Sequence, residues 1–248
     1  MSGQSPSGDQ AEVERIRAVY AARDAASGRH PAIAAAYRRL NAERTSITHE
    51  LVATVAPPPG GRLLDVGCGA GFDLARWLEA GWSPARIAGV DLVADRVARA
   101  RETCPGVDIR LGDGSRIPFD DATFDAATAV TVFSSILDPV VRRVLFVEMV
   151  RVVRPGGLVI VYDFVIRKPT NPNVRGLSLA RLADLGRPPD GSRRLSPLLQ
   201  IVAAGELIHP RVGDIAMRFA PRTHRLSWWR VQPGVERTQR AEPATAAR

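Results

Sequence analysis

The feature that most constrains this chain is a glycine-rich turn that joins an apolar strand to a helix. Residues 63–71 read Leu-Leu-Asp-Val-Gly-Cys-Gly-Ala-Gly, and a helical pattern begins at Phe72. Glycines at such a turn let the backbone bend sharply and approach a ligand with no Cβ in between. The N–H groups at the start of the next helix favour a negative group on that ligand.

The glycine spacing separates two kinds of nucleotide site. A nicotinamide-binding turn has the pattern G-x-G-x-x-G and holds a diphosphate at the helix start. Here Gly67, Gly69 and Gly71 alternate with single residues, so the turn is one residue shorter. The carboxylate of Asp65, just before the turn, would repel a diphosphate but suits a ligand with an ammonium and a carboxylate group. S-adenosylmethionine is such a ligand, and a nicotinamide-dependent oxidoreductase is disfavoured.

After residue 61, short apolar runs alternate with segments of helix length. We expect strands over 62–66, 86–90, 107–111, 124–131 and 157–164, and helices over 72–80, 93–103 and 139–153. Apolar runs bounded by Gly, Pro and Asp are typical of strands buried on both faces of a parallel sheet. This order predicts a doubly wound α/β fold. The less regular remainder predicts helices over 177–185 and 212–219 and a strand over 223–231.

Further motifs follow the later strands. Asp91 ends the second predicted strand, and Asp113 with Gly114 follows the third. Residues 118–125 read Pro-Phe-Asp-Asp-Ala-Thr-Phe-Asp, and residues 151–158 read Arg-Val-Val-Arg-Pro-Gly-Gly-Leu. In this order and spacing the motifs resemble those of the class I S-adenosylmethionine-dependent methyltransferases, closest to the broad type 11 subgroup. The resemblance covers about residues 61–164.

The resemblance implies a Rossmann-like, mostly parallel sheet with a late antiparallel strand, and S-adenosylmethionine as cofactor. In the family, an acid in the position of Asp91 accepts hydrogen bonds from the ribose hydroxyls and the next residue, Leu92, packs on adenine. The acid that corresponds to Asp113 binds the adenine amino group, and Cys68 is a small spacer in the turn. The cofactor-binding residues expected are Asp65, Gly67, Cys68, Gly69, Asp91, Leu92, Asp113, Gly114, Thr131 and Val132.

The segment before the glycine-rich turn is helical in pattern. Apolar residues at helical spacing predict two or three helices before residue 56, interrupted around residues 27–31, and the Pro- and Gly-rich run 57–61 marks a boundary. In related enzymes such helices often form a lid over cofactor and acceptor. We therefore expect a disordered tail at 1–10, an N-terminal helical lid at 11–56, the cofactor-binding domain at 61–231 and a second disordered tail at 232–248.

The residues that would act on the acceptor are less well defined. Many relatives carry a histidine just after the fourth strand, but residues 131–138 contain none, so the usual position for a general base is missing. We hypothesise that Tyr37 or Tyr162 lines the acceptor pocket. No convincing cluster of acids is present, so we expect no metal ion.

Composition limits the partners and the compartment. The net charge of +8 is nearly all arginine, spread along the chain, so we expect a solvated basic surface and no nucleic-acid partner. No run of about 18 apolar residues and no signal-peptide pattern is present, and two cysteines cannot build a disulfide framework. We expect a cytoplasmic monomer or homodimer with no membrane partner.

The function expected is transfer of a methyl group from S-adenosylmethionine to a small-molecule acceptor by in-line displacement. An O- or N-methylation in specialised metabolism fits the subgroup resemblance. Two alternatives stay open: an RNA methyltransferase, which the net charge motivates, and a non-catalytic module that binds the cofactor.

Overall fold

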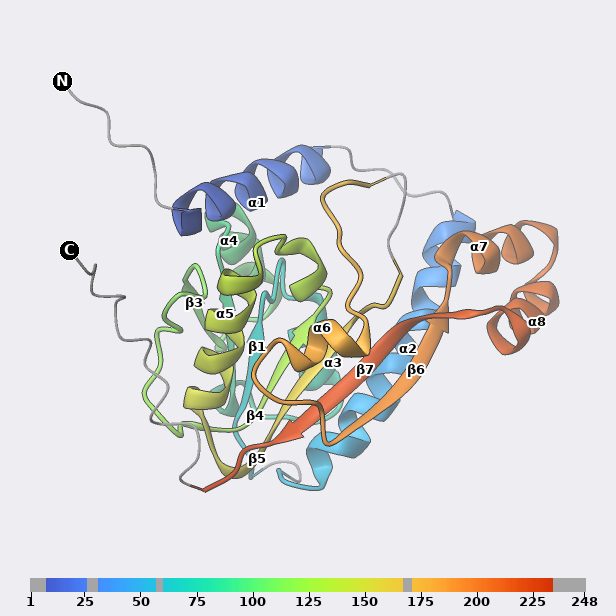
Figure 1. Cartoon of the computed structure of the whole chain (residues 1–248). Coiled ribbons are helices and arrows are strands. Elements are labelled where there is room, and N and C mark those ends of the chain that lie inside the picture. The colour runs from blue at the N-terminus through green and yellow to red at the C-terminus, as the bar shows by residue number, and fades with distance from the viewer. Residues whose placement is uncertain (1–7, 26–30, 57–59, 167–170, 234–248) are drawn as a thin grey trace.

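A seven-stranded sheet with helices on both faces forms the centre of the computed structural model, which describes residues 8–25, 31–56, 60–166 and 171–233 (Figure 1). The strands are β1 Leu63–Val66, β2 Ile87–Asp91, β3 Asp108–Leu111, β4 Phe124–Val130, β5 Val153–Phe164, β6 Gly191–Pro197 and β7 Arg222–Arg230. Their order in the sheet is β3-β2-β1-β4-β5-β7-β6. Strands β1 to β5 pair in parallel, whereas β7 is antiparallel to both of its neighbours. This confirms the doubly wound α/β fold with a late antiparallel strand.

The helices connect and cover these strands. The α-helices are α1 Gly8–Ala25, α2 Pro31–Ala53, α3 Phe72–Glu79, α4 Ala94–Thr103, α5 Pro139–Val152, α6 Leu179–Ala183, α7 Leu199–Ile208 and α8 Pro210–Phe219. Two short 3-10 turns, η1 Pro84–Arg86 and η2 Phe133–Ser135, precede β2 and follow β4. The start of α5 shows how the sequence sets a boundary. Asp138 caps this helix by accepting from Val140 N, and Pro139 occupies the first helical position.

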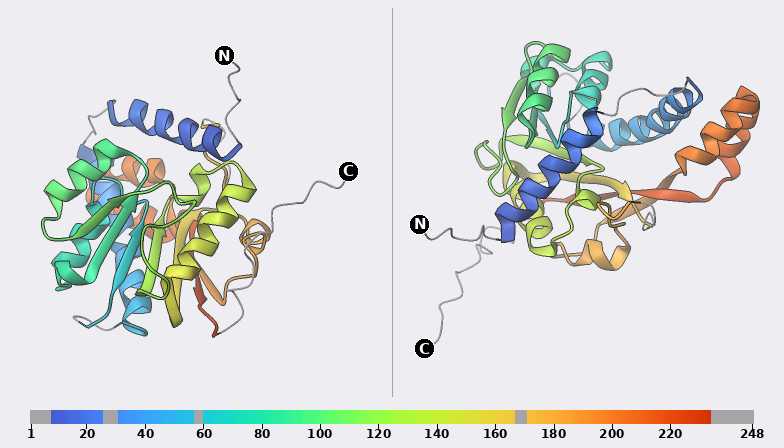
Figure 2. Two further views of the ribbon diagram at one scale, coloured as in Figure 1. Left: turned by 90° about the vertical axis from the view of Figure 1, so that its left-hand side faces the viewer. Right: turned by 90° about the horizontal axis from the view of Figure 1, so that it is seen from above.

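The two faces of the sheet pack against different helices because side chains alternate along each strand. Leu64 and Val66 of β1 belong to the core cluster that contains Phe146 and Met149 of α5. Leu63, which points to the opposite face of β1, belongs to the cluster that contains Trp77 of α3 together with residues of α2 and α4. Two hydrophobic layers therefore enclose the sheet, and Figure 2 shows the helices on its two faces.

The elements agree with the sequence expectations in the first two thirds of the chain and depart from them later. Strand β5 begins at Val153, four residues before the expected start, because Val153 pairs with Phe124 of β4. The helix expected over 177–185 is only the five-residue α6. Strand β6 and helix α7 were not predicted at all.

The expected N-terminal segments differ at their edges. Helix α1 begins at Gly8, so residues 8–10 of the expected tail are helical, and the interruption at 26–30 and the boundary residues 57–59 lie outside the described residues. Residues 1–7 and 234–248, in the two expected tails, also lie outside them. Figure 1 shows α1 across the end of the sheet where β1 and β2 meet their following loops.

Candidate functional site

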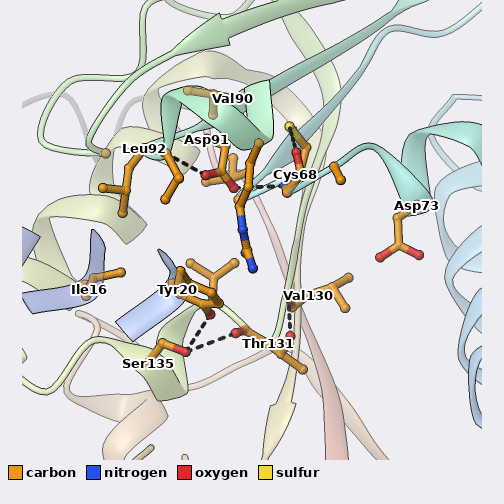
Figure 3. A pocket seen from close by; sticks show the side chains of 18 of the residues that line it. Ile16, Tyr20, Cys68, Asp73, Val90, Asp91, Leu92, Val130, Thr131 and Ser135 are labelled. Carbon is orange, nitrogen blue, oxygen red and sulfur yellow. Dashed lines mark hydrogen bonds between the residues drawn. The ribbon is translucent and has the colours of Figure 1, made fainter. Parts of the chain in front are cut away.

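A large cavity lies at the carboxyl ends of the parallel strands, which is where doubly wound folds bind ligands. Its volume is about 1070 Å³. The strand-end residues, the glycine-rich turn and α4 form its floor and one side, and α1 and α2 contribute residues from above. Figure 3 shows the strand-end residues Asp91 and Leu92 at one end of the cavity and Asp73 of α3 at the other.

The glycine-rich turn adopts the backbone that the sequence predicted. Gly67, Gly69 and Gly71 have φ values of 71°, 56° and 86°, a left-handed conformation that side chains with a Cβ disfavour. A Cβ on Gly67 would also collide with Cγ2 of Val132, the second residue after the end of β4. The backbone of the turn at Gly67 therefore packs against the side chain of Val132 in the loop after β4, and both segments line the cavity.

Asp91 joins the turn to the second strand. Its Oδ2 accepts from the backbone N–H of Gly69 and its Oδ1 from the backbone N–H of Val93, both at 2.9 Å. Asp91 is 8% exposed and lines the cavity, so its carboxylate is fixed from two sides. Each oxygen keeps lone-pair capacity for a donor in the cavity. Val93 is the N-cap of α4 and that helix has no side-chain cap, so the bond from Val93 positions Asp91 without capping the helix.

Asp113 lies at the next strand end and is also held in place. Its Oδ1 accepts from the backbone N–H of Ser115 at 2.9 Å and from the Ser115 hydroxyl at 2.6 Å. The Ser115 hydroxyl is the largest cause that lowers the pKa of Asp113 below its usual value. Asp113 therefore presents an ionised carboxylate to the cavity at neutral pH. Gly114 beside it has a φ of 81°, and a Cβ there would meet Leu145 of α5 at 2.8 Å.

Asp65 is the exception among the three strand-end acids. It is 2% exposed and is not among the described residues that line the cavity. Its Oδ1 accepts from the Thr128 hydroxyl of β4 at 2.9 Å. Burial is the largest cause that raises the pKa of this carboxyl group, and the negative charge of Asp73 acts in the same direction. The side-chain alternation in β1 explains the position, because Asp65 points to the same face as Leu63, toward α2 and α3.

The end of β4 carries a strained residue. Thr131 has a φ of 55°, rare for a residue other than glycine, and such strain is concentrated at functional sites. Its N–H donates to the carbonyl oxygen of Tyr162 at 2.7 Å, and its hydroxyl donates to the carbonyl oxygen of Val130 at 2.7 Å. These bonds hold Thr131 and Val132 at the cavity wall.

Helix α1 is fastened across the cavity by polar contacts to the loop after β4. The Tyr20 hydroxyl lies 2.9 Å from Oγ of Ser135, as Figure 3 shows. Glu12, 8% exposed, accepts from the backbone N–H of Leu137, and Arg15 donates to the carbonyl oxygen of Ser135 at 2.6 Å. Ile16 and Tyr20 of α1 also line the cavity.

A cationic side chain lies between α1 and the glycine-rich turn. The guanidinium carbon of Arg96 in α4 stands 4.2 Å from the centre of the Tyr20 ring, a cation–π arrangement. The same guanidinium passes about 3.9 Å from the place where a Cβ of Gly69 would stand. Arg96 therefore spans the cavity from the helix after Asp91 toward the covering helix α1.

The two tyrosines proposed from the sequence lie in different environments. Tyr37 of α2 lines the cavity. Tyr162 of β5 is 6% exposed, lies outside the described cavity lining, and stacks on His224 of β7 with ring centres 5.2 Å apart. Tyr162 points to the α2 face of the sheet with Ile160, and burial raises the pKa of its hydroxyl. Of the two tyrosines, only Tyr37 is therefore on the described cavity wall, so the prediction that one of them lines the acceptor pocket rests on Tyr37.

Of the expected cofactor residues, the structure brings all but Asp65 to the cavity. Gly67, Cys68, Gly69, Asp91, Leu92, Asp113, Gly114, Thr131 and Val132 line it together. Cys68 is buried, and burial is the largest cause that raises the pKa of its thiol, so it has the environment of a spacer. Sequence reasoning missed the residues of α1, α4 and α7 at the cavity. These include Ile16, Arg96, Arg99 and Leu199.

The described part of the chain has neither a metal-ligand cluster nor a helix suited to crossing a membrane. Within residues 8–25, 31–56, 60–166 and 171–233, no three His, Cys, Asp or Glu side chains stand close enough together to hold a metal ion. No helix among these residues is both long and apolar enough to cross a bilayer.

Comparison with known proteins shows which family part of this chain resembles. A family model described as a methyltransferase domain matches residues 64–161, which run from β1 into β5 and contain the glycine-rich turn, Asp91 and Asp113. The chain is 30% identical over 149 residues to the O-methyltransferase cnsE of Penicillium expansum, a match that covers 58% of this chain and 51% of that protein. Over residues 64–161 the chain is therefore similar to the methyltransferase family.

This chain is also similar to a second curated protein and to a solved structure. It is 33% identical over 131 residues to the demethylmenaquinone methyltransferase of Desulfitobacterium hafniense, which covers 50% of this chain and 49% of that protein. Geranyl diphosphate C-methyltransferase from Streptomyces coelicolor A3(2) has the same fold, with a TM-score of 0.57 at 16% identity over 83% of this chain and 86% of that one. The chain spans about half the length of the two curated relatives.

Proposed function

We propose that this chain transfers a methyl group from S-adenosylmethionine to a small-molecule acceptor. The observation that carries the proposal is the fixed carboxylate of Asp91 beside the left-handed turn at Gly67 and Gly69. An acid with spare acceptor capacity at the end of β2 suits a pair of sugar hydroxyls. The family match supports this cofactor.

The residues present fit an adenosyl amino acid along the whole floor of the cavity. Asp91 would accept from the ribose hydroxyls, Leu92 would pack on the adenine ring, and Asp113 would accept from its amino group. The backbone at Gly67, Gly69 and Thr131 would meet the methionine part, where a Cβ on Gly67 has no room. The bound cofactor supplies a methyl group made electrophilic by its sulfonium, so no metal ion is needed to activate it.

The remaining cavity wall supports an apolar acceptor. Ile33 and Tyr37 of α2, Phe72 at the start of α3 and Leu199 of α7 all line the cavity. A volume of about 1070 Å³ exceeds the roughly 300–1,000 Å³ of a pocket for one small ligand, which leaves room for an acceptor beside the cofactor. Among these four residues Tyr37 is the one with a hydroxyl group, so we propose that Tyr37 contacts the acceptor.

The chain's own contribution to catalysis is then positioning and exclusion of water. Helix α1 covers the cavity through Glu12 and Tyr20, and closing a site in this way removes water from the reacting groups. Holding two reactants in line can supply about 7–11 kcal/mol of the barrier. Acceptors that are already nucleophilic at neutral pH need no further base.

Calorimetry and product analysis test the proposal. We expect the purified chain to bind S-adenosylhomocysteine and not NAD, and to label a small molecule when incubated with methyl-labelled cofactor and a metabolite extract. Absence of S-adenosylhomocysteine binding would refute the cofactor assignment. Binding without transfer to any metabolite would favour the non-catalytic module, and label found in RNA would favour the RNA methyltransferase.

A further inference from the structure

Helices α7 and α8 form a hairpin at the end of the molecule farthest from β3. Figures 1 and 2 show both helices projecting beyond the sheet, next to the start of α2. The two helices meet at glycines, since a Cβ on Gly205 would lie 2.9 Å from the backbone N of Gly213. Val202 and Ala203 of α7 pack on Ala36 and Leu40 of α2 in a separate core cluster.

Polar contacts fix the hairpin to the rest of the chain. Arg39 of α2 forms ion pairs with Glu206 of α7 and Asp214 of α8, and it also donates to the carbonyl oxygen of Pro210. The side of the hairpin that faces α2 is therefore covered by both apolar and polar contacts to that helix.

Both helices of the hairpin expose large apolar side chains. Leu207 and Ile208 at the end of α7 are 64% and 75% exposed, and Ile215 and Phe219 of α8 are 56% and 72% exposed. Ile215 and Phe219 are four residues apart, so they share one face of α8. Single exposed apolar residues are ordinary, but a group of four on one small hairpin indicates an interaction surface.

Arginines accompany this apolar group. Arg211 and Arg218 of α8 are exposed, and Arg218 stands 5.4 Å from the ring centre of Phe219. Between residues 191 and 225 the chain has six arginines, no lysine and two acids, Glu206 and Asp214. Both of these acids are engaged by Arg39. Arg39, Arg211 and Arg218 therefore stand against two acids, so the hairpin with Arg39 carries a net positive charge beside its exposed apolar residues.

This combination selects the kind of partner. In a symmetric dimer the same surface meets itself, so two groups of arginines would face each other and repel. An anionic lipid surface instead attracts the arginines and accepts apolar side chains between its headgroups. We propose that the α7–α8 hairpin docks on an anionic lipid surface, with Leu207, Ile208, Ile215 and Phe219 in the headgroup region and Arg211 and Arg218 on acidic headgroups.

The hairpin also adjoins the candidate acceptor wall. Leu199, the first residue of α7, lines the cavity together with Ile33 and Tyr37, and α7 packs on α2. A chain docked through the hairpin would hold this side of the cavity near the lipid surface, where apolar acceptors concentrate. The docking itself depends on neither the cofactor nor methyl transfer. It differs from the sequence expectation of no membrane partner, which rested on the lack of a spanning segment.

Vesicle sedimentation with the full chain tests the docking. Vesicles of equal parts phosphatidylglycerol and phosphatidylcholine should bind the chain at least about tenfold more tightly than pure phosphatidylcholine, and added salt should weaken this binding. The double variant Ile208→Glu, Phe219→Glu should lose at least about tenfold in vesicle affinity. Arg211→Gln with Arg218→Gln should lose about thirtyfold on the anionic vesicles only.

Matched variants on other surfaces control for charge and folding. Val140→Glu changes an exposed apolar residue of α5, and Arg86→Gln with Arg116→Gln removes the same charge elsewhere. These variants should bind vesicles within about twofold of the unmodified chain, allowing only the long-range effect of net charge. Binding of S-adenosylhomocysteine should stay unchanged in every variant, which separates this test from that of the proposed function.

Several results would overturn the docking. If the unmodified chain is a dimer that Ile208→Glu dissociates, a second copy of the chain covers this surface and the docking on lipid is refuted. Equal binding to neutral and anionic vesicles, or equal loss in the hairpin and control variants, would also refute it.

Discussion

The backbone N–H of Gly69 donates to Oδ2 of Asp91 at 2.9 Å, which ties the glycine-rich turn to the end of the second strand. Two segments that lie 22 residues apart in the chain thus form one surface of the cavity. The other carboxylate oxygen accepts from Val93, so both oxygens have a fixed direction. Asp91 can therefore orient a ligand without first ordering its own side chain.

Replacing Asp91 with Asn tests this arrangement. The amide keeps one acceptor oxygen but turns an NH₂ group toward either Gly69 or Val93, both of which are donors. We expect S-adenosylhomocysteine to bind about 1.5–3 kcal/mol more weakly, as measured by calorimetry. Asp95→Asn, an exposed position on α4, is the control and should bind normally. Unchanged affinity in Asp91→Asn would remove this residue from the cofactor site.

Replacing Gly67 with Ala tests the close approach of the turn to Val132. The left-handed φ makes the substitution unfavourable by about 1–2 kcal/mol, measurable by urea unfolding. Gly81→Ala is a matched control, because its φ is 89° and a Cβ there has nothing within 4 Å. Both variants should lose stability through the backbone, but only Gly67→Ala should also weaken cofactor binding. Equal cofactor affinity in the two variants would contradict a role for the turn.

The residues of this turn were predictable because they are local. The glycine spacing and the position of Asp91 after an apolar run can each be recognised within a few consecutive residues. The structure places both the glycines and Asp91 at the cavity. Asp65 shows the limit of that reasoning. A strand end can be predicted from sequence, but whether its side chain faces the cavity or the layer beneath depends on register, and here Asp65 meets Thr128 of β4.

The later elements could not be predicted for a different reason. Strand β6 carries Ser192, Arg193 and Arg194 in its first half and buries only its last three residues, so it lacks an alternating apolar pattern. It exists because β7 pairs with it from about 30 residues further along the chain. The cavity residues of α1, α2 and α7 likewise come together only through tertiary packing, for which a single sequence holds no local signal.

Replacing Asp65 with Asn should stabilise the ligand-free protein. Burial raises the pKa of this carboxyl group in the folded state, so stability falls as pH rises above the ordinary pKa of an aspartate, where the unfolded chain ionises first. The amide oxygen of Asn can still accept from Thr128 without that cost. We expect a higher Tm for the variant at pH 7 and a smaller loss of Tm between pH 5 and pH 8, by thermal unfolding. An unchanged dependence of Tm on pH would show that Asp65 is not the group that titrates.

The two tyrosines offer the last comparison, because only one of them lines the cavity. Tyr37→Phe should raise KM for the acceptor, since Tyr37 is on the cavity wall. Tyr162→Phe should leave KM unchanged but cost about 1 kcal/mol of stability, because its buried hydroxyl bonds to Ser196. Steady-state kinetics with urea unfolding measures both quantities on each variant. If Tyr162→Phe raised KM and Tyr37→Phe did not, the acceptor would approach from the α2 face of the sheet instead of from the cavity.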